Sequence, residues 1–172
     1  FVGAWKDMEK AVKMGKVRAL GISNFDANDE VWNTIMQAAT IKPQVLQMEC
    51  HPYAQRVEMR KKAAAEGIQV ECWFPLGGAM SNGALFKDPV IKKIAEAHGK
   101  TPAQVILRWH IQEGFSVIPG ASNPDYIKEN IQIFDFQLTD DEMQQMRSLN
   151  KEKRFFNATL EDVEKMVWGA RL

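Results

Sequence analysis

Apolar side chains follow two different spacings along this chain. Four short apolar runs, bounded by glycine, proline or polar turns, predict buried strands. Between them, apolar positions recur every three or four residues, as Trp5, Met8 and Val12 do in the first segment, which predicts amphipathic helices. The predicted strands are residues 17–22, 44–50, 68–74 and 115–119, and the predicted helices are residues 4–14, 30–39, 55–66, 89–98, 102–112, 124–132, a segment that starts after 139, and 159–168.

Capping signals support the helix boundaries. Thr101 and Thr139 are each followed three residues later by Gln or Glu, which is the pattern of a capping box, and Pro102 suits a first helical position. Residues 75–88 are rich in small side chains, and we predict a long loop there. Loops of this length inside a domain are usually functional or disordered.

Alternating strands and helices predict right-handed βαβ units and a parallel sheet. No linker, low-complexity segment or clear repeat divides the 172 residues, so one domain is expected. Parallel α/β folds bind their ligands at the carboxyl ends of the strands. Four successive strand ends carry polar or aromatic clusters, which would meet at one rim. They are Ser23-Asn24, Gln47 with Glu49, Trp73-Phe74, and residues 119–123.

Charge and cysteine content narrow the expected partners. Lys plus Arg is 22 and Asp plus Glu is 22, which argues against nucleic acid or an anionic membrane recognised by bulk charge. No run of about 18 apolar residues and no basic-then-apolar leader appears, so neither a membrane span nor a signal peptide is expected. Two cysteines are too few for a disulfide framework and favour a reduced, cytoplasmic setting. Because the chain opens on a helix at Phe1, we expect a cut from a longer sequence or, alternatively, a trimmed N-terminus.

The stretch from Lys16 to Phe25 closely resembles a signature of the aldo-keto reductases, nicotinamide-dependent carbonyl reductases built on a (β/α)8 barrel. Residues 47–52 and 72–77 resemble two further strand ends of that family. Val117-Ile118-Pro119 with Pro124, Ile127, Glu129 and Asn130, together with Arg108-Trp109 in the preceding helix, resemble its phosphate and adenine loop and the helix before it.

The resemblance covers essentially the whole chain as the C-terminal half of the family. A full barrel needs about 250 residues and eight strands. The expected fold is therefore the C-terminal half of a (β/α)8 TIM barrel, with four parallel strands and surrounding helices. Residues 1–172 would form a single partial domain, units five to eight of the barrel, with a tail at 151–172.

This resemblance implies a site for NADP or NAD. Ser23, Asn24 and Gln47 would hydrogen-bond the nicotinamide carboxamide, which needs both donors and acceptors, and Trp73 would stack on the ring. The loop after Phe74 would fold over the pyrophosphate, and Glu129 and Asn130 would contact the adenine. The full implied set is Ser23, Asn24, Gln47, Trp73, Phe74, Pro75, Leu76, Gly77, Ile118, Pro119, Gly120, Ala121, Ser122, Tyr126, Glu129 and Asn130.

Some of these residues could instead have purely structural roles. Ser23-Asn24 could form only a helix-entry turn. Gln47 and Glu49 share strand parity and could belong to a hydrogen-bonded polar layer, and a structural role is favoured for Glu49. Trp73 could be ordinary core, although its place beside Phe74-Pro75 at a strand end weakens that reading.

The chain departs from the family around the 2′-phosphate of NADP. Gly120, Ala121 and Tyr126 stand where the family usually has Lys, Ser or Thr, and Arg. A 2′-phosphate carries about two negative charges, and Arg or Lys pairing supplies much of the discrimination against NAD. The choice between NADP and NAD is therefore left open. Ser122, Asn123 and the helix start at Pro124 could still hold a phosphate weakly, and Tyr126 could stack on adenine. Phe74 stands where many relatives have a small hydroxylated residue, which removes one phosphate contact.

A larger departure concerns catalysis. The family's Tyr, Lys, Asp and His come from its N-terminal half, and no stretch of this chain matches their motifs, so no catalytic residue is predicted here. The two tyrosines of the chain, Tyr53 and Tyr126, do not lie in the sequence motif that surrounds the family's catalytic Tyr. His98 and His110 are expected to be surface or packing residues. Cys50, His51 and Cys72 lack a recognised ligand spacing, and no metal site is predicted.

The predicted function is the cofactor-binding half of an NAD(P)H-dependent oxidoreductase that reduces aldehydes or ketones by hydride transfer. The substrate would be a small carbonyl compound in the full-length parent, and the 172 residues alone would have little activity. The alternative is a non-catalytic half-barrel. Unpaired strand edges at 17–22 and 115–119 and an open apolar face would then drive self-association or pairing with a missing N-terminal half. An unrelated βα domain is a third reading. Residues 151–172, with Arg154, Phe155, Phe156 and Trp168, would line or flank the substrate pocket, or simply pack on the barrel.

Overall fold

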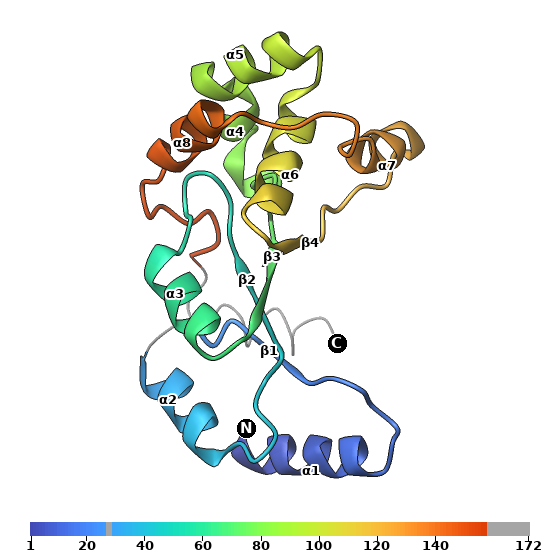
Figure 1. Cartoon of the computed structure of the whole chain (residues 1–172), viewed down its shortest axis with the longest axis vertical. Helices are drawn as coiled ribbons and strands as arrows, with labels where there is room; N and C mark the ends of the chain where they lie inside the picture. Colours follow the sequence, from blue (N-terminus) through green and yellow to red (C-terminus); the bar gives the residue numbers. More distant parts are fainter. Residues whose placement is uncertain (27–28, 158–172) are drawn as a thin grey trace, which may run out of the picture.

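Four short parallel strands form the centre of the molecule, in the order β1-β2-β3-β4 (Figure 1). The structure, a computed structural model, describes residues 1–26 and 29–157. In register, Ser23 lies beside Gln47, Gln47 beside Glu71, and Glu71 beside Ser116. The predicted parallel sheet is confirmed. The strands are β1 (Gly21–Ser23), β2 (Val45–Glu49), β3 (Gln69–Trp73) and β4 (Ser116–Val117).

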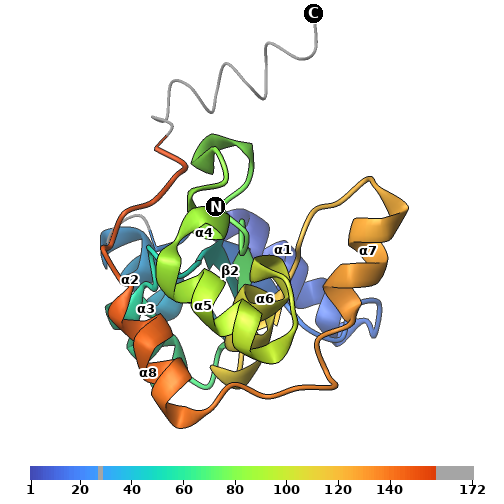
Figure 2. The same cartoon turned by 90° about the horizontal axis from the view of Figure 1, so that it is seen from above.

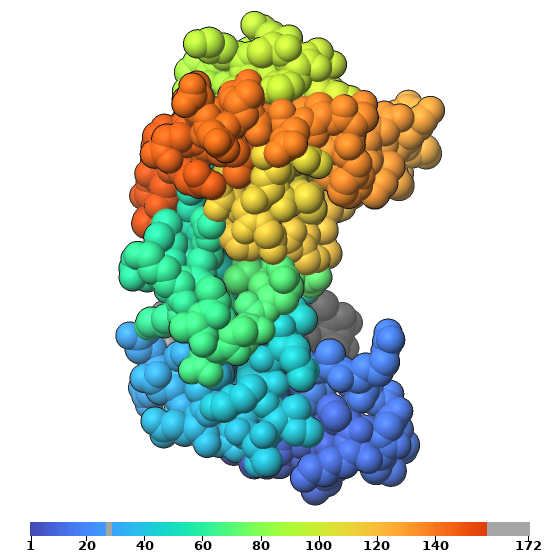
Figure 3. Space-filling model, viewed as in Figure 1, coloured from blue at the N-terminus to red at the C-terminus, as the bar shows by residue number. Residues whose placement is uncertain are grey.

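Helices alternate with these strands. They are α1 (Val2–Lys13), α2 (Asp29–Ala38), α3 (Val57–Ala65), the 3-10 turn η1 (Ala79–Ser81), α4 (Ala84–Lys87), α5 (Pro89–His98), α6 (Pro102–Gln112), α7 (Pro124–Ile131) and α8 (Asp140–Ser148). Helices α1 and α2 lie at one end of the molecule and α5 and α8 at the other, while α7 projects to one side (Figures 1 and 2). The surface is crescent-shaped, because the α1 end and α7 project toward the same side (Figure 3). None of the described helices is long and apolar enough to cross a membrane.

The two faces of the sheet differ in chemistry. Alternate strand residues point to opposite faces. Ile22, Leu46 and Cys72 share one face and are buried in the larger core cluster with residues of α1, α2 and α3. The opposite face carries Ser23, which is exposed, and Gln47, which is half-buried. Among the described residues, β1 is buried on one face alone and this second face of the sheet is largely polar. The expectations of a strand at 17–22 buried on both faces and of an open apolar face are therefore wrong.

A second core cluster lies among the helices that follow β3. Ile91, Ile106, Trp109 and Met146, from α5, α6 and α8, are fully buried in it. Leu85 joins them from α4. The predicted loop at 75–88 thus contains η1 and α4, since burial of one leucine gives the short helix an apolar anchor.

The first and last strands are shorter than predicted. Residues 17–19 are exposed and unpaired, and β1 begins at Gly21. A side chain at Gly21 would place its Cβ 3.1 Å from both the Cβ and the carbonyl oxygen of Val45, so the close approach of β1 to β2 favours glycine. The predicted helix at 159–168 lies outside the described residues.

Two predicted helix caps are confirmed. The Thr101 hydroxyl accepts from Gln104 N at 3.3 Å while the Gln104 side chain accepts from Thr101 N at 3.0 Å. Thr139 and Glu142 repeat this exchange at the start of α8. Asp88 caps α5, accepting from Val90 N at 2.9 Å, which the sequence pattern did not single out.

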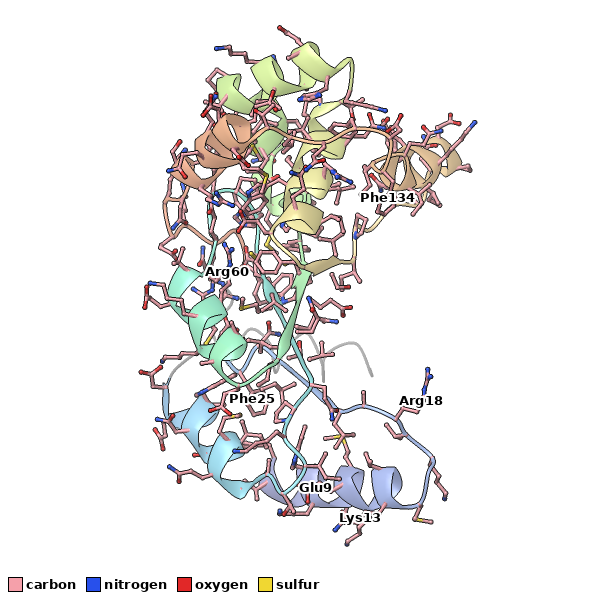
Figure 4. The ribbon with its side chains drawn as sticks, viewed as in Figure 1. Glu9, Lys13, Arg18, Phe25, Arg60 and Phe134 are labelled. Atoms are coloured by element: carbon pink, nitrogen blue, oxygen red, sulfur yellow. The ribbon has the colours of Figure 1, made fainter. Side chains whose placement is uncertain are left out.

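A buried carboxylate fastens α1 to the segment between α2 and β2. Glu9 Oε1 accepts hydrogen bonds from Thr40 N at 2.7 Å, Ile41 N at 3.0 Å and the Trp5 indole at 3.1 Å. The side chain rises from α1 toward the rest of the molecule (Figure 4). The hydrogen bond from Ile41 lowers the pKa of Glu9, and Lys6 and Thr40 add to that effect against burial. Glu9 therefore adds a polar attachment for α1 beside the apolar one that the buried Trp5 provides.

We expect Ile91→Ala to lower the free energy of unfolding by about 2–5 kcal/mol, because a fully buried side chain leaves a cavity. The matched control is Met14→Ala directly after α1, where the methionine is 64% exposed and the expected loss is below about 0.5 kcal/mol. Urea unfolding followed by circular dichroism measures both. Equal losses in the two variants would contradict the second core cluster.

Candidate functional site

The ends of three strands bring four predicted residues together. Ser23 pairs in register with Gln47, and the backbone N–H of Asn24 donates to Gln47 O at 2.9 Å. The Trp73 indole donates to Asn24 Oδ1 at 2.9 Å. Asn24 adopts a left-handed backbone with φ 60°, a conformation that Asn tolerates better than most residues. We call Ser23, Asn24, Gln47 and Trp73 the rim cluster.

Gln47 also belongs to a row of hydrogen-bonded polar side chains on the polar face of the sheet, the Glu71 ladder. The Gln47 amide donates to Glu71 Oε1 at 2.8 Å, and Ser116 Oγ donates to Glu71 Oε2 at 3.1 Å. Glu71 therefore fixes the orientation of the Gln47 amide. The sequence patterns pointed to neither Glu71 nor Ser116, because only the strand register reveals that they share a row with Gln47.

Glu49 acts as a buried clamp for the segment at 154–156. Its side chain is fully buried, and Oε1 accepts from Phe155 N at 2.6 Å and Phe156 N at 3.2 Å, while Oε2 accepts from Arg154 Nε at 2.8 Å. His51 Nε2 lies 3.2 Å from Oε1. The structural role favoured for Glu49 is thus confirmed, and the segment that it holds lies against the rim.

The pKa of Glu49 reflects this clamp. Burial alone would raise the pKa of the carboxyl, but hydrogen bonds from His51, Arg154, Phe155 and Phe156 outweigh burial and lower the pKa to about 2. The carboxylate therefore stays charged through the physiological range. Through this contact Phe156 reaches Trp73, with ring centroids 5.5 Å apart.

A cavity of about 860 Å³ opens between the loops that follow β3 and β4. It meets the first turn of α6 at Thr101 and the start of α7 at Asn123. Seven predicted residues line it: Leu76, Gly120, Ala121, Ser122, Tyr126, Glu129 and Asn130. The other lining residues, which the sequence analysis did not place in the predicted set, are Gly78, Ala79, Phe86, Thr101, Pro102, Ala103 and Asn123.

The remaining predicted residues do not line this cavity. The rim cluster lies at the strand ends, and Phe74, Pro75, Gly77, Ile118 and Pro119 belong to the segments between rim and cavity. Gly78 has φ 58°, and an added Cβ there would lie 2.9 Å from the Phe74 ring, so the loop packs tightly on that ring. The turn itself therefore requires a glycine at position 78.

The cavity wall is poor in charge. Among its lining residues, all within the described part of the chain, Glu129 is the single charged side chain. Its carboxylate accepts from the Thr101 hydroxyl at 2.6 Å. Nothing lies within 4 Å of the position that a Cβ on Gly120 would take. The starts of α6 and α7, which carry partial positive charge, are thus the positive elements at the wall.

The histidines and Tyr53 each contact other parts of the fold, whereas Tyr126 is exposed. His110 is a packing residue, as predicted, and is fully buried. His98 lies 2.9 Å from Glu142. His51 packs against the Phe155 ring, and it is His110, not His51, whose ring nitrogen lies with the sulfurs of Cys50 and Cys72. Tyr53 donates its hydroxyl to Asp88 at 2.7 Å, and Tyr126 stands 60% exposed at the cavity.

Comparison with known proteins fits this arrangement of rim and cavity. A model of the aldo/keto reductase family matches residues 2–151. The chain belongs to this family. Among curated relatives it is similar to aldo-keto reductase family 1 member A1 of Bos taurus, 41% identical over 157 residues that make up 88% of this chain and 48% of the relative. It is also 40% identical to 9,11-endoperoxide prostaglandin H2 reductase of Trypanosoma cruzi, over 90% of this chain and 53% of that protein.

Solved structures of aldo-keto reductases superpose on this chain. The apo form of Gox0644 gives a TM-score of 0.83 at 38% identity, over 92% of this chain and 56% of that one. A Gox0644 variant in complex with NADPH gives 0.80 at 39% identity, over 87% and 53%. The chain thus spans about half the length of these relatives, and its four parallel strands with surrounding helices correspond to half of a (β/α)8 barrel.

We expect Glu49→Gln to weaken attachment of the 154–156 segment and to cost about 1.5–3 kcal/mol of stability at pH 7, because hydrogen bonds to a charged acceptor are lost. A pKa lowered by folding adds stability above the pKa of unfolded Glu, about 4.3. That stability disappears as the pH falls toward about 2. Urea unfolding between pH 7 and pH 2 should therefore show a decline that is shallower in the variant.

The control is Glu58→Gln, whose carboxylate forms an exposed pair with Lys61 at 2.8 Å and should leave the pH profile unchanged. Identical pH profiles for wild type and Glu49→Gln would rule out the clamp.

Proposed function

We propose that this chain is the cofactor-binding part of an NAD(P)H-dependent reductase of small aldehydes or ketones. One observation carries the proposal. The rim cluster, which offers amide and hydroxyl groups beside an indole, lies at strand ends next to a large cavity suited to the rest of a dinucleotide. Family membership, and the NADPH complex of a Gox0644 variant, support the same assignment.

The residues at the rim fit a nicotinamide. A bound nicotinamide cofactor supplies the hydride for carbonyl reduction. Ser23 and Gln47 would pair with the carboxamide, and the Trp73 ring, held by its hydrogen bond to Asn24, would cover one face of the ring. The Glu71 ladder keeps the Gln47 amide in one orientation, which limits the ordering cost on binding.

Proton donation is proposed to come from outside the described residues. The Tyr53 hydroxyl already donates to Asp88, and burial followed by this contact raises the pKa of Tyr53 to about 12. Tyr126 stands at the cavity, away from the rim cluster. We therefore propose little turnover by the 172 residues alone. The two free, buried thiols favour a reducing compartment such as the cytoplasm.

We further propose that the site accepts NADH at least as well as NADPH. The lining residues provide no Lys or Arg for a 2′-phosphate, and Glu129 adds a negative charge to the wall. An uncompensated phosphate beside a carboxylate is unfavourable, and the helix starts at α6 and α7 offset only part of that cost.

Gly120→Lys combined with Tyr126→Arg should therefore tighten NADPH binding at least about tenfold relative to NADH, because each charge-assisted hydrogen bond contributes about 1.5–3 kcal/mol. Space is open at Gly120 and Tyr126 is exposed, so both changes fit. Calorimetric titration of wild type and variant with each dinucleotide measures the ratio.

The matched control is Gly120→Gln with Tyr126→Gln, which adds side chains without charge and should leave the NADPH-to-NADH ratio as in wild type. If folded wild-type protein binds neither dinucleotide at millimolar concentration, the proposed function fails. A wild type that prefers NADPH strongly refutes only the proposed preference.

A second candidate function is a self-associating half-barrel. In the described residues β1 and β4 are sheet edges, and a groove of about 780 Å³ runs beneath α7. Its wall includes Ile127, Ile131 and Phe134, which are 54%, 65% and 64% exposed. Phe134 follows α7 on the projecting side of the molecule (Figure 4). We propose that a second copy of the chain covers this groove.

Sedimentation velocity at tens of micromolar should then give a dimer or larger species. Ile131→Asp with Phe134→Asp should shift the chain toward monomer, because charge in an apolar contact is costly to bury. Met14→Asp, at a 64% exposed position beyond α1, is the control and should leave the distribution unchanged. A monomeric wild type under these conditions excludes self-association.

A further inference from the structure

Three buried side chains from different elements meet beneath the rim. Cys50 directly follows β2, Cys72 lies in β3, and His110 lies in α6, and all three are fully buried. Their sulfur and nitrogen ligand atoms lie within 4.8 Å of one another. We call them the thiol–imidazole cluster. Neither the rim cluster nor the cavity uses these side chains.

The orientation of His110 matches that of a metal ligand. Its Nδ1 lies 2.8 Å from the carbonyl oxygen of Ile106, one helical turn earlier. A proton on Nδ1, donated to that carbonyl, leaves the Nε2 lone pair free. Metal-binding histidines almost always donate their second ring N–H in this way.

Nε2 then faces another electron-rich atom. It lies 3.1 Å from the carbonyl oxygen of Cys50. Two lone pairs at this distance repel unless a positive species lies with them. A second ring proton is one such species, and a cation bound by Nε2 and the nearby sulfurs is the other.

The two thiols also interact with one another. A hydrogen bond from Cys72 lowers the pKa of Cys50, with His110 and the positive charge of Arg60 adding to that effect. Burial raises the pKa of Cys72, as do Cys50 and Glu71. Arg60, in α3 (Figure 4), is itself paired with Glu113.

We propose that Cys50, Cys72 and His110 bind one thiophilic divalent cation of the zinc type. A tetrahedral zinc ion with bonds of about 2.0–2.3 Å holds its ligands roughly 3.5 Å apart, so small side-chain movements close the site. Two thiols release their protons to solvent as two metal–sulfur bonds form. The ion, two thiolates and a neutral imidazole then sum to zero charge, which suits a fully buried position. The Cys50 carbonyl oxygen lies beside Nε2 for the fourth position.

Cadmium is the probe, because its thiolate complexes absorb in the near ultraviolet. The chain has two cysteines in total, so a thiolate–cadmium band reports on this cluster alone. Reduced, folded protein should take up one Cd²⁺ per chain, and Zn²⁺ should compete for it. Zn²⁺ should also raise the midpoint of thermal unfolding and slow the reaction of the thiols with an aromatic disulfide reagent.

Cys72→Val keeps an apolar side chain of similar size and should remove the one-to-one uptake and the thermal shift, with folding checked by circular dichroism. His110→Asn should weaken uptake by at least about tenfold. His98→Asn, which removes a histidine that pairs with Glu142, is the matched control and should bind as wild type does.

Absence of the cadmium band in reduced, folded wild type overturns the proposal, as does a band of full intensity in Cys72→Val. A chain that is isolated two hydrogen atoms lighter, and that takes up no metal after reduction, assigns the two sulfurs to a disulfide and also overturns it. NADH and NADPH take no part in these measurements, so the outcome is independent of the proposed function.

Discussion

Side chains alternate between the two faces of the sheet along β2 and β3, and this alternation determines where the rim cluster and the thiol–imidazole cluster can lie. Residues two apart share a face, so Leu46 and Met48 point into the helix-covered core while Val45, Gln47 and Glu49 point to the other side. The same parity in β3 separates Val70 and Cys72 from Glu71 and Trp73. Burial of the first set under the helices fixes the register, because a slip of one residue would exchange the two faces.

Glu49 links this register to the segment at 154–156. It belongs by parity to the open face, yet it is fully buried because residues far along the chain cover it. The hydrogen bonds offset the cost of burying a carboxylate. Covering this one carboxylate brings Phe156 to Trp73, so the aromatic wall of the rim depends on a contact that is long-range in sequence.

Local signals in the sequence sufficed for the longer helices of the described residues, but not for η1 and α4, which lie in the predicted loop at 75–88. The capping boxes at Thr101 and Thr139 formed as expected, and the shared parity of Gln47 and Glu49 predicted their common face. The wrong expectations have a common physical cause. An apolar run such as 17–22 specifies hydrophobicity but not a partner strand, and residues 17–19 have none in the described structure. Strand periodicity likewise says nothing about whether a second layer covers the outer face.

The site residues that the sequence did not predict are those whose role depends on tertiary proximity. Glu71 became visible as the support of Gln47 only through the register, and Thr101 became a wall of the cavity only once α6 stood beside the loop after β4. The proximity of His110 to the cysteines was also invisible in the sequence, because His110 and the carbonyl of Cys50 are 60 residues apart along the chain. Cys50 and Cys72 directly adjoin Glu49 and Trp73 in the chain. Alternation then places the buried cluster on one face and the clamp and indole on the other, so whatever orders the cluster also restrains the backbone that carries the rim.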